Sequence, residues 1–357
     1  MGVDLRHGGN REALAAVIGC DPAAVLDASA SLAPWTPRLS RLNPTALRDY
    51  PDRGQTRLRE LLAALHGLSS TAVLPGNGAA ELFTWAARDA AMAGVSGLLA
   101  PGFADYRRAL SCWGGVWNEQ ALDLSWGSAV ASSYPSVDAD VLWICNPHNP
   151  TGQLWHRESL EPLLQQYALV ICDEAFLPLV PDGEVQSLIP LVAEHSNLVV
   201  VRSLTKLFGI AGVRLGYAVG LPERLQSWAS WRDPWPVNGV AMALADQLLA
   251  DPSRYRNWCR RVQRWTHREG TWMRDQLARL PGLHPLPSAA NFLLMKGEES
   301  LVPLRETLER RDRILLRDCS SFTGLGDHWL RIGLQRRRDN RRIIAGLRRA
   351  LRMRPLI

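Results

Sequence analysis

Between about residues 75 and 220, short apolar runs alternate with stretches that have the hydrophobic spacing of helices. This alternation is typical of βαβ units, in which helices cover a mainly parallel sheet. The runs that we predict as strands are 97–100, 141–145, 169–172, 198–201 and 215–219. Several of them are apolar throughout, as expected of strands that are buried on both faces. The sequence therefore predicts an α/β fold.

The pattern changes after the segment Pro234-Trp235-Pro236. Long helical stretches follow at 239–249 and 252–280, and a last amphipathic helix is predicted over 336–354. Between them lie strand-like segments at 291–295, 314–317 and 329–334. The first 45 or so residues hold one helix, 10–18, and a proline-rich extended arm. We therefore predict an arm (1–48), a large α/β domain (49–238) and a smaller α+β domain (239–357).

The composition is that of a globular protein, with 46% hydrophobic and 21% charged residues. No apolar run is long enough for a membrane span, and the first residues lack the pattern of a secretory signal. We expect a soluble, cytoplasmic protein without a membrane partner. The six cysteines form no C-x-x-C pair and the eight histidines are dispersed, so we expect neither a disulfide framework nor a metal.

The net charge of +6 comes almost entirely from arginine. The most basic stretch, 336–354, has the spacing of an amphipathic helix whose arginines form a solvated outer face. Nucleic-acid binding needs a basic stripe with interleaved aromatic residues, so we expect no nucleic-acid partner.

Polar clusters follow four of the predicted strands, at 101–106, 146–152, 173–176 and 203–206. In open α/β sheets, ligands bind outside the carboxyl ends of the strands. We therefore expect these clusters to converge on one edge of the sheet and to form the functional site.

Lysine occurs only at positions 206 and 296. Lys206 follows an apolar run and lies beside the hydroxyls of Ser203 and Thr205, whereas Lys296 is best interpreted as an incidental surface lysine. A primary amine attacks carbonyl groups, which is the covalent chemistry used with pyridoxal phosphate. An incidental surface position is the alternative for Lys206 as well.

Three further features extend this interpretation. Asp173 ends a predicted strand and could pair with a protonated pyridine nitrogen, although a lone Asp there is more often a helix cap. Arg214 could share a phosphate with Ser203 and Thr205, or simply form a surface salt bridge. The loop 76–78 precedes an alanine-rich helix and offers backbone N–H groups to a phosphate, although an isolated Asn-Gly often marks only a turn. The ordered set Asn149, Asp173, Lys206 and Arg214 favours the cofactor interpretation.

The segments 76–78, 146–152, 173–175, 203–206 and 214–216 together resemble the fold-type I pyridoxal-phosphate enzymes of the class I/II aminotransferase family. The resemblance covers nearly the whole chain. It implies a large domain with a mainly parallel sheet of seven-stranded type between helices, and a smaller C-terminal α+β domain. Within the family, the segments 7–10, 27–29, 50–52, 101–104, 173–176, 234–238 and 314–317 are similar to the threonine-phosphate decarboxylases of cobalamin biosynthesis and to histidinol-phosphate aminotransferases.

The resemblance implies roles for individual residues. Lys206 would bind the cofactor covalently, Asp173 would pair with the pyridine nitrogen, Asn149 would bind the phenolic oxygen and Tyr106 would stack on the ring. The groups expected at the cofactor phosphate are Gly78, Ala79, Ser203, Thr205 and Arg214, with Tyr50 from the neighbouring subunit of a homodimer. The residues expected at the substrate are His7, Gly8, Ser31, Asn149, Arg317 and Arg331, the last at the substrate carboxylate.

Two positions depart from the family pattern. Ser31 stands where the decarboxylases carry Asn, and it is a shorter donor and acceptor. Phe176 stands where the aminotransferases usually carry a Tyr that bonds the phenolic oxygen of the cofactor, and this departure fits the decarboxylases.

The resemblance thus implies decarboxylation of L-threonine O-3-phosphate to (R)-1-aminopropan-2-ol O-phosphate and CO2. The alternative is an aminotransferase that uses a 2-oxo acid, because the cofactor residues of the two kinds of enzyme are the same. A third hypothesis is a cofactor-bound regulatory protein without turnover. Such proteins usually carry a DNA-binding domain, and we find no spare segment for one.

Overall fold

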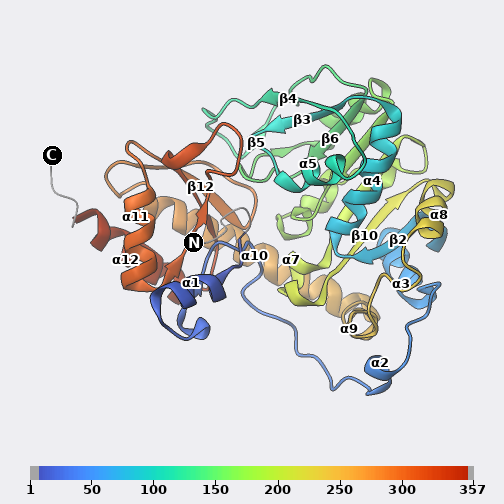
Figure 1. Cartoon of the computed structure of the whole chain (residues 1–357), viewed down its shortest axis with the longest axis horizontal. Helices are drawn as coiled ribbons and strands as arrows, with labels where there is room; N and C mark the ends of the chain where they lie inside the picture. The colour runs from blue at the N-terminus through green and yellow to red at the C-terminus, as the bar shows by residue number, and fades with distance from the viewer. Residues whose placement is uncertain (1–7, 353–357) are drawn as a thin grey trace.

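The computed structural model describes residues 8–352, and Figure 1 shows two sheets joined by the long helix α10 (Pro252–Leu277). The larger sheet has seven strands in the order β2-β10-β9-β8-β6-β3-β4. In that order they span Val73–Asn77, Leu215–Gly220, Leu198–Ser203, Leu169–Asp173, Val141–Cys145, Ser96–Ala100 and Trp117–Ala121. The predicted α/β fold is therefore confirmed.

The two edge strands of this sheet, β2 and β4, were not predicted from the sequence. Strand β2 contains Pro75 and Gly76, which are rare inside strands and suggested a loop. Strand β4 is polar and mostly exposed, so it lacks the apolar run that revealed the central strands. The five strands that were predicted are present, each within one or two residues of its expected ends.

Both faces of the large sheet are buried, in two separate cores. Along β8, Leu169 and Ile171 contribute to one core, and Val170 and Cys172 contribute to the other. Helices α4 (Ala79–Ala93), α5 (Ala104–Ser111) and α8 (Pro222–Trp231) pack on the first face. Helices α3 (Thr56–His66), α9 (Gly239–Leu249) and α10 pack on the second. Burial on both faces explains the continuous apolar runs of the central strands.

Strand β10 runs antiparallel to both of its neighbours, and the other strands pair in parallel. Its first residue, Leu215, therefore pairs with Asn77 at the carboxyl end of β2, and the next residue, Gly216, pairs with Ser203 at the end of β9. Arg214, which directly precedes β10, thus lies at the same edge as the ends of β8 and β9.

The smaller sheet is antiparallel, in the order β11-β12-β15-β14, with bounds Leu283–Pro285, Phe292–Gly297, Trp329–Gly333 and Arg317–Asp318. Helices α11 (Val302–Thr307) and α12 (Arg337–Arg352) accompany it (Figure 1). The predicted strand 314–317 is in fact two short strands. Its first half, β13 (Ile314–Leu315), leaves this sheet and pairs in parallel with β1 (Leu26–Asp27) of the N-terminal arm.

Pairing with β13 fixes the arm, which also holds α1 (Arg11–Ile18), to the smaller sheet. The N–H of Gly333 at the end of β15 donates a hydrogen bond to the carbonyl of Ala28 over 2.7 Å. Two long-range contacts thus place the residues after β1 beside β14 and β15.

The remaining elements are short connections. They are α2 (Thr45–Arg48), α6 (Arg157–Leu160), α7 (Leu204–Phe208), and the pair β5 (Val130–Ala131) with β7 (Leu154–Trp155). Helix α9, which we assigned to the small domain, packs on α2 and α3 as well as on α10. The domain boundary at 238 therefore stays a prediction. Among residues 8–352, no helix has both the length and the apolar character needed to cross a bilayer.

A buried ion-pair network anchors the loop that follows β8. The guanidinium of Arg202 contacts Glu174 at 2.7 Å and Glu184 at 2.8 Å. Glu174 also accepts hydrogen bonds from Ser187 Oγ and from the Leu188 N–H, at 2.8 and 2.7 Å. Arg202 and Glu174 are 1% and 0% exposed. Each would destabilise the fold as a buried, unpaired charge if the other were removed.

We predict that Arg202→Ala lowers the free energy of unfolding by about 3–5 kcal/mol, because it leaves Glu174 buried and uncompensated. Chemical denaturation followed by circular dichroism measures this change. The control is Arg348→Ala on the exposed side of α12, expected to stay within about 0.5 kcal/mol of the parent. A loss below about 1 kcal/mol for the Arg202 variant would contradict the structural role of the network.

Candidate active site

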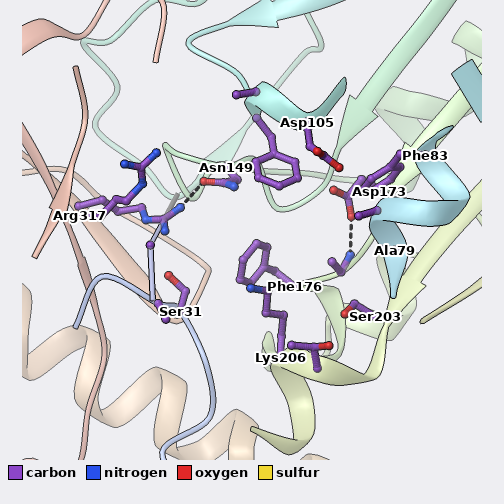
Figure 2. A pocket seen from close by; sticks show the side chains of 18 of the residues that line it. Ser31, Ala79, Phe83, Asp105, Asn149, Asp173, Phe176, Ser203, Lys206 and Arg317 are labelled. Atoms are coloured by element: carbon purple, nitrogen blue, oxygen red, sulfur yellow. Dashed lines mark hydrogen bonds between the residues drawn. The ribbon is translucent and has the colours of Figure 1, made fainter. Parts of the chain in front are cut away.

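The polar clusters that follow the strands converge on a cavity of about 220 Å³ at the carboxyl edge of the large sheet (Figure 2). The large-sheet side of the cavity is formed by strand ends and helix starts, and the opposite side by the arm and the smaller sheet. Its lining includes Gly8, Ser29, Ser31, Ala79, Phe83, Phe103, Asp105, Asn149, Asp173, Phe176, Ser203, Thr205, Lys206, Arg214, Arg317, Phe322 and Arg331.

Lys206 enters the cavity from α7, the short helix that directly follows β9. Its Nζ lies 5.4 Å from the centre of the Phe176 ring, and Figure 2 shows the two side chains next to each other. The pKa of Lys206 is lowered to about 8, mainly by burial and also by the positive charges of Arg331 and Arg214, against the opposing effect of Asp173. An amine with this pKa is partly neutral near pH 7, as a nucleophile toward an aldehyde must be.

Asp173 is the last residue of β8 and is 5% exposed. Its Oδ2 accepts a hydrogen bond from the Tyr106 hydroxyl at 2.6 Å, and its Oδ1 accepts one from the Ala175 N–H at 2.9 Å. Burial raises the pKa of Asp173 to about 6, against the lowering effect of these two donors and of Lys206. A buried carboxylate at the cavity wall fits a protonated ring nitrogen, which would supply a positive charge.

The start of α4 forms a cradle for an anion beside Arg214. Gly78 has a φ of 74°, and a Cβ at this position would lie only 2.6 Å from Nη2 of Arg214. Gly78 at the N-cap of this 15-residue helix has no side chain to cap it, so its first N–H groups remain available as donors. Thr205 Oγ1 is also buried without a hydrogen-bond partner among the described residues. This donor set fits the phosphate of the cofactor.

The opposite wall carries two guanidinium groups, those of Arg317 and Arg331, and Figure 2 shows Arg317 across the cavity from Asp173. Arg331 donates to Asn149 Oδ1, and its Nη2 donates to the Ser29 carbonyl at 3.1 Å. Burial and the nearby Arg317 lower the pKa of Arg331 to about 10. These two cations favour an anionic substrate.

Ser31 is 1% exposed and lines the cavity on the same side as Arg317 (Figure 2). Within residues 8–352 its Oγ has no hydrogen-bond partner. An unpaired buried hydroxyl costs free energy, so this group is available to a ligand. Gly8 and Asn149, also expected at the substrate, line the same cavity.

Tyr106 does not occupy the position that we expected. Its ring is 5% exposed and lies behind the wall, packed against Phe83, Phe103 and Trp143, and its hydroxyl contacts Asp173. Phe103 lines the cavity instead. Because α5 begins at Ala104, the residue just before the helix points over the strand end, whereas Tyr106 turns into the core. Phe103, which was not predicted from the sequence as a site residue, therefore presents an aromatic ring to the cavity in place of Tyr106.

Tyr50, which was expected at the cofactor phosphate, does not line the cavity. Tyr50 is 80% exposed and stacks on Trp235, with 4.4 Å between the ring centres, so its role across a subunit boundary stays a prediction. His7 lies outside the described residues. Over the described range, no group of three or more His, Cys, Asp and Glu side chains is arranged to hold a metal ion.

We predict that Lys206→Ala abolishes covalent attachment of pyridoxal phosphate and lowers turnover by roughly a thousand-fold or more, because no other amine lines the cavity in the described structure. Borohydride reduction followed by mass spectrometry measures the attachment. Lys296→Ala removes the only other lysine, which is exposed on β12, and should keep both properties. Attachment that persists in the Lys206 variant would show that this lysine is not the anchor.

The chain is similar to known proteins both in sequence and in structure. The family model "Aminotransferase class I and II" matches residues 24–347. Threonine-phosphate decarboxylase from Salmonella typhimurium is 32% identical, over 97% of this chain and 96% of the relative. Histidinol-phosphate aminotransferase from Symbiobacterium thermophilum is also 32% identical, over 94% of this chain and 88% of the relative.

Solved structures show the same architecture. L-threonine-O-3-phosphate decarboxylase from Porphyromonas gingivalis is 26% identical with a TM-score of 0.75, over 87% of this chain and 93% of that one. Histidinol-phosphate aminotransferase from Sinorhizobium meliloti, in complex with pyridoxal-5'-phosphate, has a TM-score of 0.79 at 20% identity, over 96% and 95% of the two chains. The chain therefore belongs to the class I and II aminotransferase family of fold-type I enzymes, and its cofactor is pyridoxal 5'-phosphate.

Proposed function

We propose that this protein removes CO2 from L-threonine O-3-phosphate and forms (R)-1-aminopropan-2-ol O-phosphate for cobalamin biosynthesis. The observation that carries the proposal is the cavity wall opposite Asp173, where Arg317 and Arg331 present two cations to a substrate with two anionic groups. The similarity to the Salmonella decarboxylase along 97% of the chain supports this choice of substrate. We place the enzyme in the cytoplasm, without a nucleic-acid or membrane partner.

Pyridoxal phosphate supplies a ring that accepts the electron pair of a bond broken at the substrate's α-carbon. Asp173 would hold the proton on the ring nitrogen, and the α4 start with Arg214 would hold the phosphate. Arg331 would bind the substrate carboxylate and set its angle to the ring plane. Because the bond perpendicular to the ring is the one that breaks, this contact decides between loss of CO2 and loss of the α-hydrogen.

Lys206 has a second task after CO2 has left. With a pKa of about 8, its amine can exist in both protonation states near neutral pH. The protonated form would donate a proton to the α-carbon, and the neutral form would serve as the nucleophile that binds the cofactor. One lysine can thus perform both tasks in turn.

Phe176 supports the decarboxylase over the aminotransferase. It lines the cavity beside Lys206 but has no hydroxyl to offer the phenolic oxygen of the cofactor. That oxygen would depend on Asn149, which Arg331 already holds through Oδ1. The unpaired Ser31 hydroxyl would then bind the substrate from the arm side.

The alternative is an amino transfer to a 2-oxo acid. The 32% identity to a histidinol-phosphate aminotransferase favours it, and the cofactor residues are equally suited to it. In that case the same wall would hold the α-hydrogen, rather than the carboxylate, perpendicular to the ring.

A product assay tests the proposal. We expect the purified holoenzyme to convert O-phospho-L-threonine to aminopropanol phosphate and CO2 in equal amounts, without any oxo acid. Product formation is followed by ³¹P NMR and CO2 release, with Lys206→Ala as the inactive control. Turnover that requires 2-oxoglutarate and releases no CO2 would support the aminotransferase instead.

We also propose that the protein is a homodimer in which Tyr50 reaches the cofactor phosphate of the neighbouring subunit. Tyr50 is 80% exposed and Leu47, in the preceding helix α2, is 76% exposed. Tyr50 stacks on Trp235, and the guanidinium of Arg53 lies 4.5 Å from the centre of the same Trp235 ring. Together these residues present an aromatic surface that a second copy could cover.

We expect light scattering to give about twice the 39.6 kDa of one chain. Tyr50→Phe should keep this mass and weaken cofactor binding by roughly five- to tenfold, because it removes one hydrogen bond to a phosphate. Fluorescence titration of the apoenzyme measures that affinity. A monodisperse, fully active monomer would contradict the role of Tyr50 across the boundary.

A further inference from the structure

Tyr106 is a buried phenol whose hydroxyl points at the carboxylate of Asp173. Its ring is fixed by three aromatic neighbours, Phe83, Phe103 and Trp143, with ring centres 5.2, 5.5 and 5.1 Å away. The hydroxyl donates to Asp173 Oδ2 at 2.6 Å, a short bond of the kind formed with an ionised acceptor. With its ring held this way, Tyr106 has little freedom to turn its hydroxyl elsewhere.

Several other groups surround the same carboxylate. The Ala175 N–H donates to Oδ1 at 2.9 Å. The Cys145 thiol of β6 lies 3.9 Å from Oδ2 and 3.3 Å from the Pro147 carbonyl, and it can donate to either acceptor. The positive charge of Lys206 in α7 lowers the pKa of Asp173, and the negative charge of Glu174 raises it.

Glu174 directly follows the end of β8, and its carboxylate is already bound by Arg202. Within residues 8–352, the Tyr106 hydroxyl makes the shortest side-chain hydrogen bond to Asp173, at 2.6 Å against 3.9 Å for the Cys145 thiol. Burial works against the charged form of Asp173 and raises its pKa, whereas the Tyr106 hydrogen bond favours the charged form.

We propose that Tyr106 is a positioning residue that keeps Asp173 ionised and fixes the plane of its carboxylate for the ring nitrogen of the cofactor. Without the hydroxyl, Oδ2 would be buried with one donor fewer, and the neutral acid would gain population near neutral pH. A neutral acid holds a protonated pyridine nitrogen less tightly than a carboxylate does. The inference rests on cofactor binding alone and is the same for a decarboxylase and for an aminotransferase.

The test is Tyr106→Phe, read by fluorescence titration of the apoenzyme with pyridoxal phosphate between pH 5 and 9. We expect the Kd at pH 7 to rise about tenfold, the usual effect of one hydrogen bond to a charged group. The acidic limb of the pH dependence of the Kd should move upward by about one unit. An unchanged Kd with an unchanged pH profile would overturn the proposal.

Tyr134→Phe is the matched control. Tyr134 is also buried, at 9% exposure, and its hydroxyl donates to the Trp143 carbonyl at 3.1 Å instead of to Asp173. Its loss should lower stability without moving the Kd or its pH profile. Equal effects of the two substitutions on the Kd would assign the effect to general packing and overturn the proposal.

A double-mutant cycle with Asp173→Asn isolates the interaction, because an amide has no charge for Tyr106 to stabilise. In this background, removal of the Tyr106 hydroxyl should change the Kd less than about twofold. A tenfold effect that persists there would overturn the proposal.

If Tyr106→Phe does not fold, 3-fluorotyrosine at position 106 gives a second measurement. Its more acidic phenol is a stronger donor and should move the acidic limb downward, and an unmoved limb would overturn the proposal. Failure of the product assay would leave these affinity readouts intact, so the two proposals can fail separately.

Discussion

The site depends on the enclosure of one amine and one carboxylate at the same edge of a sheet. Enclosure lowers the pKa of Lys206 to about 8 and raises that of Asp173 to about 6, so each is brought toward neutrality. The backbone fixes their relation, since β8 and β9 pair in parallel with Asp173 opposite Val201. Helix α7 follows β9 at once and brings Lys206 to the floor of the cavity. A regular pairing of two strands thereby sets the distance over which the chemistry takes place.

A second buried pair, Arg202 with Glu174, lies on the other face of the same two strands. Glu174 follows Asp173, the last residue of β8, and its carboxylate contacts Arg202 and not the cavity, so these neighbours in the chain belong to different environments. Arg202 and Glu174 are bonded to each other and to Ser187. Asp173 and Lys206 share the cavity but keep free positions that a cofactor can satisfy. The buried charges of Arg202 and Glu174 thus stabilise the fold, whereas those of Asp173 and Lys206 face the cavity where a cofactor can bind.

Much of the large sheet could be predicted because its central strands are buried on both faces and therefore apolar throughout. The site could be located for a related reason, since parallel strands bring their polar end residues to one edge. The local sequence pattern did not predict β4 as a strand, because a strand at the edge of the sheet does not need apolar residues. It did not predict β2 either, because β2 contains Pro75 and Gly76.

The sequence also did not predict the direction in which side chains point near the start of a helix. Phe103 and Tyr106 are both aromatic and only three residues apart, and only the observed start of α5 separates a cavity wall from a core position. The contact of the arm with the smaller sheet also left no local signal. Ser29 and Arg331 are 302 positions apart, and the sequence around either residue gives no indication that the two are in contact.

The bond between the arm and the smaller sheet has a consequence for how the enzyme can move. Gly8 and Ser29 are tied to the part of the chain that carries Arg317 and Arg331, because β1 pairs with β13, Gly333 bonds to Ala28 and the Gly9 N–H donates to Ser29 Oγ. The arm ends this attachment after Ser31, where the Ala33 N–H donates to the Lys206 carbonyl at 3.0 Å. Lys206, Asp173 and the start of α4 belong instead to the large sheet and its helices. A hinge motion along α10 would move Arg317, Arg331 and the start of the arm together relative to Lys206 and Asp173. Binding of the substrate and exclusion of water from it would then be a single movement.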